Sequence, residues 1–134
     1  MRDNDWLFKR MEDIWELLFP DVEKKNKVNI TFKGKWKHKF GHIKRKKDTS
    51  TEIAINSIFT DPLIPECIID ITIAHELVHY MHGFNSPHPQ RYKHPHAGGI
   101  VIKELKKRGF THQMKIEKDF IQHKWPYFVK KHNE

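Results

Sequence analysis

The chain has 134 residues, 37% of them hydrophobic and 31% charged, a balance that suits one globular domain with a polar surface. No apolar run approaches the roughly 20 residues of a membrane span, and the N-terminus lacks the basic-then-apolar order of a signal peptide. The single cysteine, Cys67, excludes an internal disulfide and a cysteine-based zinc ribbon. These features predict a cytoplasmic protein with no membrane partner.

Positive charge is concentrated in one stretch of the chain. The formal net charge is +8, and residues 24–47 contain eleven Lys or Arg and no Asp or Glu. Such a block commonly meets a polyanion, so we expect nucleic acid as a partner. A solvated basic surface without a partner is the alternative. The candidate contacts are Lys33, Lys35, Lys37, Lys39, Lys44, Arg45, Lys46 and Lys47.

The first predicted element is a helix over residues 5–19. Its apolar residues Leu7, Met11 and Ile14 recur at helical spacing, and Pro20 ends the pattern. We expect this helix to cover the core.

Alternating apolar and polar residues then predict a small antiparallel sheet of three or four strands. Residues 28–32 form the first strand, and residues 33–41 follow with lysines on one face and aromatic residues on the other. Residues 52–59 form a further strand. We expect Trp36 and Phe40 to pack in the core; if exposed, they would stack on the bases of a single strand.

The most informative stretch is HELVH at residues 75–79. On a helix, residues four apart lie on one face, so His75 and His79 can bind one zinc ion while Glu76 reaches a water on that ion. This is the HExxH pattern of zinc peptidases, in which the Glu is the general base. A strand would separate the two histidines by about 13 Å, too far for one ion. A helix ending near Gly83 is therefore predicted, despite the β-branched residues before the motif.

A catalytic zinc usually has three protein ligands, so a third is expected further along the chain. The pattern HExxHxxGxxH does not fit, because His82 and Asn85 occupy its Gly and last His positions. We expect the third ligand to be His96, with His94 as the alternative. Two weaker candidates are His88 and Glu104.

The remainder is predicted to be a loop over residues 84–95, a helix over residues 97–108 and a tail over residues 110–134. The tail has spaced apolar residues and is expected to be ordered, as a short strand and a helix interrupted at Pro126. It is long enough to reach back over a cleft. We expect the tail histidines and His82 to be exposed.

These pieces together resemble the SprT-like zinc metallopeptidase domains of the Spartan/SprT family. The resemblance covers about residues 28–109, through WKHKFG at residues 36–41, EIAIN at residues 52–56, the HELVH helix over residues 69–79 and HAGGI at residues 96–100. The order and spacing of several separate pieces make it more specific than HExxH alone.

Two departures from the family pattern stand out. Ala97 and Ile100 replace a Gly and a Phe, which leaves His94 open as a third ligand. The zinc ribbon that follows many SprT-like domains is absent, since the chain has one cysteine.

Residue pattern and resemblance together predict one α+β domain over residues 1–134, with its core at about 28–109 and the tail packed on or over it. The N-terminal helix and the HExxH helix pack against the sheet. Hydrolysis of a peptide bond also needs a donor that stabilises the tetrahedral oxyanion, and the candidates for this role are Tyr80, Arg91 and Tyr92.

The resemblance implies a zinc-dependent endopeptidase for DNA-associated or DNA-crosslinked proteins, in the cytoplasm or at the nucleoid, with single-stranded DNA as the favoured partner. Zinc on His75, His79 and His96 (or His94) and a catalytic Glu76 would carry the reaction. Two other interpretations stay open. One is a minimal zinc peptidase unrelated to DNA and restrained by its own C-terminal tail. The other is a non-enzymatic nucleic-acid-binding domain with structural zinc.

Overall fold

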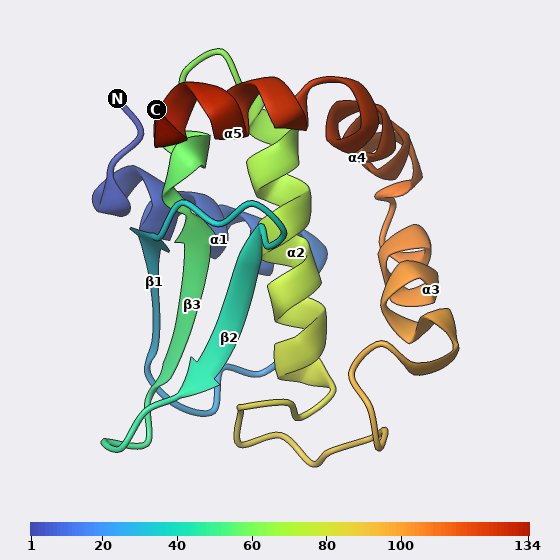
Figure 1. The fold of residues 1–134 in the computed structure, drawn as a ribbon. Helices are drawn as coiled ribbons and strands as arrows, with labels where there is room; N and C mark the ends of the chain where they lie inside the picture. The colour runs from blue at the N-terminus through green and yellow to red at the C-terminus, as the bar shows by residue number, and fades with distance from the viewer.

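Helices pack against one small sheet in the computed structural model, which describes residues 1–134. In chain order the elements are α1 (Asn4–Leu18), β1 (Val28–Lys33), β2 (Gly41–Arg45), β3 (Thr51–Asn56), the 3-10 helix η1 (Ser57–Thr60), α2 (Glu66–Met81), the 3-10 helix η2 (Ala97–Gly99), α3 (Ile100–Lys107), α4 (Thr111–His123) and α5 (Trp125–Asn133). Figure 1 shows α1 behind the sheet, α2 alongside β2, and α5 across one end of the domain. The predicted α+β class is confirmed.

The sheet is mixed, with the strand order β1-β3-β2. β2 pairs antiparallel with β3, as predicted, but β1 pairs parallel with β3, with Ile30 opposite Ile53. The prediction of a wholly antiparallel sheet is wrong in this pair. The reason is that the chain passes from β1 to β2 without pairing these two strands, so that room for one strand is left between them. β3 fills that gap after the hairpin from β2 and so runs in the same direction as β1.

Residues 34–40, predicted as part of a strand, form a loop instead. Gly34 turns the chain out of β1 with a φ of +73°, a conformation that favours glycine. The fully buried Asn56 then holds the loop, because its side-chain amide donates to the carbonyl oxygens of Trp36 and Lys39 at 2.8 and 2.9 Å. These two carbonyl groups therefore accept hydrogen bonds from a side chain and not from a neighbouring strand.

α2 is the central helix of the domain. It contacts α1, β2 and β3 as well as α3 and α4, so nearly all of its faces are buried. A helix enclosed on all sides is apolar all round, which explains the run of isoleucines from Ile68 to Ile73. The prediction of a helix through this β-branched run is confirmed. None of the helices combines the length and the apolar character that crossing a membrane would require.

The C-terminal residues form two helices, α4 and α5, and the predicted short strand is absent. Pro126 lies in the first turn of α5, where it costs no hydrogen bond. The Trp125 indole donates to the carbonyl oxygen of Lys37 at 2.7 Å, and its ring packs against Phe40, 4.8 Å between centroids. Phe120 is also buried against Phe40. The tail is thus part of the hydrophobic core.

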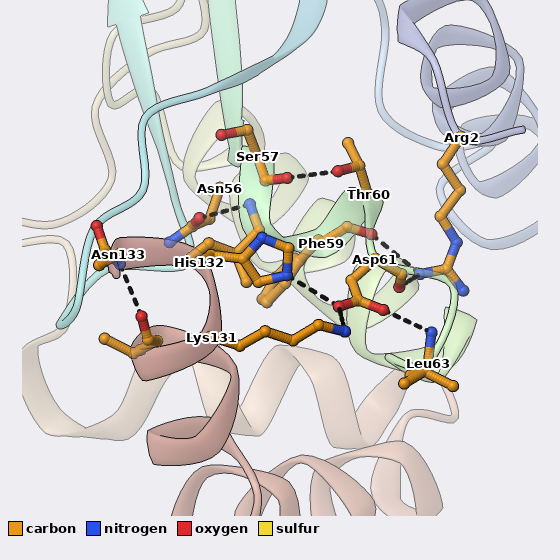
Figure 2. A network of polar contacts seen from close by, with 12 residues as sticks. Arg2, Asn56, Ser57, Phe59, Thr60, Asp61, Leu63, Lys131, His132 and Asn133 are labelled. Atoms are coloured by element: carbon orange, nitrogen blue, oxygen red, sulfur yellow. Dashed lines mark hydrogen bonds and ion pairs between the residues drawn. The ribbon is translucent and has the colours of Figure 1, made fainter.

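Both ends of the chain are tied to the segment that runs from η1 to the start of α2 (Figure 2). The Arg2 guanidinium donates to the carbonyl oxygens of Phe59, Asp61 and Ile64. The Asp61 carboxylate, which is 3% exposed, accepts from Lys131 at 2.7 Å and from His132 at 2.8 Å. Burial alone would raise the pKa of Asp61, but the hydrogen bonds outweigh it and lower the pKa to about 2. The expectation that His132 is exposed is wrong.

Candidate metal centre

Three histidines from two parts of the chain meet at one point. His75 and His79 lie one turn apart on α2, and His96 comes from the end of the long loop before η2. Their candidate ligand atoms all lie within 4.8 Å of one another, and the Nε2 atoms of His75 and His96 are 3.2 Å apart. Nitrogens bound tetrahedrally to zinc at about 2.0–2.1 Å are themselves about 3.3–3.4 Å apart. The cluster therefore fits a shared metal ion.

The long loop after α2 determines which histidine joins the cluster. Gly83, with a φ of +83°, ends α2 and lets the chain turn back. Asn85 then ties the loop to the sheet, since its side-chain amide donates to the carbonyl oxygen of Ile43 at 2.9 Å. The loop returns to α2 with His96 in the cluster, while His94 is exposed and outside it.

The imidazoles on α2 lie in surroundings that disfavour their protonated forms. Burial, with a smaller contribution from His96, lowers the pKa of His75 to about 4. Burial, followed by His75, His96 and His82, lowers the pKa of His79 to about 3. Both rings are thus neutral near pH 7, which is the state that binds a metal ion.

Glu76 is a buried carboxylate beside the cluster. Glu76 is 4% exposed, and its side chain forms no hydrogen bond or ion pair with the protein. Burial raises the pKa of Glu76 to about 8, opposed by the nearby charge of Lys39. A carboxylate with no protein partner is available to exchange a proton with a molecule in the cleft.

Two adjoining cavities open at the cluster, with volumes of about 270 and 280 Å³. Both are lined by Gly41, His75 and Glu76. The first cavity extends between the loop at residues 38–40, α2 and α4. The second extends between β2, α2 and the loop that carries His96. Because β2 is an edge strand, its unpaired side borders the candidate metal centre.

Gly41 allows this close approach of strand and helix. A Cβ atom at this position would lie 2.7 Å from the carbonyl oxygen of Ala54 and 3.3 Å from a methyl group of Thr72. The backbone of β2 could not keep its place against β3 and α2 with any larger residue. Glycine here thus shapes both cavities.

None of the three residues suggested for oxyanion stabilisation lines either cavity. The Tyr80 hydroxyl is turned away and donates to Asn26 at 2.7 Å. Arg91 is exposed, and Tyr92 packs against His82 with ring centroids 4.9 Å apart. His82 is 2% exposed, so the expectation of an exposed side chain there is wrong.

The eight basic residues predicted to contact nucleic acid are all exposed, but they do not share one strand face. They are spread over the end of β1, the loop at residues 34–40, β2 and the turn after it. Lys33 and Lys46 both pair with Glu52, at 3.5 and 3.3 Å. Lys39 lies over the Trp36 ring, 4.2 Å from its centroid, and lines the first cavity. Charge thus continues from the basic surface into the cleft.

Glu117 and Ile121 on α4 also line the first cavity, and His42 on β2 lines the second. Sequence reasoning missed all three. No motif marks Glu117, since its position depends on how α4 packs against α2. No motif marks His42 either, since its position depends on how β2 lies beside α2.

Comparisons with protein-family models, curated proteins and solved structures find no match to this chain. Its function is therefore inferred from the geometry and chemistry of the site.

Proposed function

We propose that this protein is a zinc-dependent endopeptidase of the SprT-like type, acting on proteins that are associated with or crosslinked to DNA. The observation that carries the proposal is the meeting of His75 and His79 of the HExxH helix with His96, beside the buried Glu76. No fourth His, Cys, Asp or Glu joins the cluster. Three protein ligands and an open position are typical of catalytic zinc, whereas structural zinc has four.

The residues of the cleft support hydrolysis of an amide bond. Zinc, when bound, supplies Lewis acidity and lowers the pKa of a coordinated water to about 7. The charge of the bound metal ion would lower the pKa of the neighbouring Glu76 carboxyl, so that Glu76 would accept the proton of the attacking water on its carboxylate and pass it to the leaving nitrogen. Its position next to His75 on one rigid helix keeps that carboxylate in the cleft throughout the reaction.

The free edge of β2 supports a peptide as the substrate. An extended chain can pair with the backbone of an edge strand, and here Gly41, His42 and Ile43 border the centre. Strand addition requires an extended, unfolded segment of at least about three residues in the substrate. We therefore expect cleavage in loose segments and tails and not in folded domains.

The basic surface supports DNA as the place where this protease acts. Lys39, in the loop at residues 34–40, lines the first cavity, and further exposed lysines follow on this loop and on β2. Because Trp36 packs against His42 and the partly buried Phe40 packs against Trp125, the contact is expected to be electrostatic and not based on stacking. Binding should weaken steeply as salt rises.

The test is cleavage of a basic, loosely folded protein by the zinc-loaded wild type and by Glu76→Gln, each with and without single-stranded DNA. We expect wild-type cleavage that DNA increases, with Glu76→Gln slower by about 100-fold or more. Chelation should stop the reaction, and zinc should restore it.

Cleavage that depends on Glu76 but ignores DNA would leave a zinc peptidase without the proposed partner. An absence of cleavage under every condition would contradict the enzymatic proposal and favour a binding domain.

A further inference from the structure

Helix α4 brings a second carboxylate to the candidate active site. Glu117 lines the first cavity together with His75 and Glu76. It is half-buried and forms no hydrogen bond or ion pair with any protein group. Burial raises its pKa to about 7. Glu117 lies outside the segment that resembles SprT-like domains.

The lack of a partner sets Glu117 apart from most other buried or half-buried carboxylates. Four of these carboxylates are paired with basic side chains: Glu52, Asp61, Asp70 and Glu104. Only Glu76 and Glu117 are unpaired, and both line the same cavity. Withdrawing a carboxylate from water without a compensating charge is unfavourable. The arrangement therefore leaves room for a cation that is not part of the chain.

The basic side chains that line the cavity do not pair with Glu117. His38 and Lys39 both line it. The Lys39 ammonium lies over the Trp36 ring at 4.2 Å and forms no ion pair with Glu117. The lysines next to Glu117 on α4, Lys115 and Lys118, are exposed.

Apolar side chains complete the cavity wall around Glu117. Ile121 follows Glu117 by one turn of α4, and Phe40 comes from the opposite loop. Such a wall suits the methylene groups of a long basic side chain whose charged end reaches a carboxylate. It equally accepts the ammonium group of a free amino terminus.

We propose that Glu117 makes this cavity a subsite for a cationic group of the substrate, a primary ammonium from either a lysine side chain or a free amino terminus. This inference rests on the proposed peptidase function and adds a specificity-determining residue from α4. Cleavage would then be placed where a substrate presents such a charge next to the scissile bond.

Peptide binding to the uncleaving Glu76→Gln protein, loaded with zinc, tests the subsite separately from turnover. Fluorescence anisotropy would compare peptides with lysine or norleucine at successive positions, each with a free or acetylated amino terminus. We expect one lysine position, or the free terminus, to strengthen binding by about tenfold. Adding Glu117→Gln should remove that gain and leave the norleucine, acetylated peptide unaffected.

Asp119→Asn is the matched control, because Asp119 is an exposed carboxylate on the same helix. It removes the same charge without altering the cavity, so the preference should persist. If acetylation of the peptide abolishes the stronger binding, the amino terminus supplies the ammonium group. If the stronger binding survives acetylation, a lysine side chain supplies it. Either result supports the subsite.

Equal binding of all peptides, or a preference that survives Glu117→Gln, would overturn the inference even if the wild type is an active peptidase. The converse result is also distinct: a Glu117-dependent preference in a protein that never cleaves would uphold the subsite and reject the peptidase.

Discussion

At the residue scale, the choice between His96 and His94 tests the centre most directly. We expect His96→Ala to weaken zinc binding by more than about 100-fold, because loss of an outer hydrogen-bond partner alone costs about 10- to 100-fold. His94→Ala is the matched control, since His94 is exposed and outside the cluster. Zinc content after dialysis and competition with a chromogenic chelator would measure both. Equal losses in the two variants would reject the assigned cluster.

Asp61 allows a prediction about stability and pH. Its pKa of about 2 in the folded protein lies below the ordinary value of 3.8. The charged form is therefore favoured by folding, and its contribution is fully present above about pH 4 and is lost as the pH falls towards 2. The shift corresponds to about 2 kcal/mol. Asp61→Asn should lower the free energy of unfolding by about that amount at neutral pH.

Urea unfolding of both proteins between pH 7 and pH 2 would measure the effect. The difference between wild type and Asp61→Asn should shrink through the acid range. A difference that stays constant down to pH 2 would contradict the role assigned to the contacts with Lys131 and His132.

At the element scale, the loop at residues 34–40 depends on one side chain. Asn56→Asp keeps the acceptor oxygen but removes both hydrogen bonds to the loop. Because each bond contributes about 1 kcal/mol and the carbonyls would lose their partners, we expect a loss of about 2–4 kcal/mol in the free energy of unfolding. Asn29→Asp is the control, since the Asn29 side chain forms no hydrogen bond. Urea unfolding and hydrogen exchange of the loop would show the difference; similar losses in both variants would contradict it.

Local sequence patterns were sufficient to predict two of the helices but not the loop at residues 34–40. Helical spacing and the four-residue separation of His75 and His79 were enough to predict α1 and α2, because these signals lie within one element. Alternation in residues 33–41 predicted a strand that does not form. The carbonyl groups of this segment accept hydrogen bonds from Asn56, the last residue of the following β2–β3 hairpin, and no local pattern reports such a contact.

At the scale of the whole molecule, the site joins segments far apart in the sequence. His96 could be ranked above His94 from its place before a predicted helix, but the turn at Gly83 and the anchor at Asn85 bring it to α2. Glu117 reaches the cleft only because α4 packs on α2. The parallel pairing of β1 with β3 likewise follows from the order of all three strands. Such arrangements depend on packing between elements, which a single sequence does not display.

The C-terminal helices carry the last prediction, because they bear on whether the tail restrains the proposed peptidase. Removing residues 110–134 would expose the core packed on Phe120, Trp125 and Phe128, which are all buried. Truncating one such aromatic residue costs about 3–5 kcal/mol, and a whole domain is stable by only about 5–15 kcal/mol. We therefore expect the truncated protein to lose its cooperative fold and not to gain activity.

Near-ultraviolet circular dichroism, thermal unfolding and zinc content would measure the outcome of this truncation. Tyr127→Ala is the matched control, since Tyr127 is 60% exposed on α5 and should change stability little. Trp125→Ala, in contrast, removes both the aromatic packing on Phe40 and the hydrogen bond to Lys37, and should reproduce part of the loss. A truncated protein that stays folded, holds zinc and cleaves faster than the full chain would instead establish the tail as an inhibitor. α4 would then be a removable cover, and the substrate cleft would have to form without Glu117.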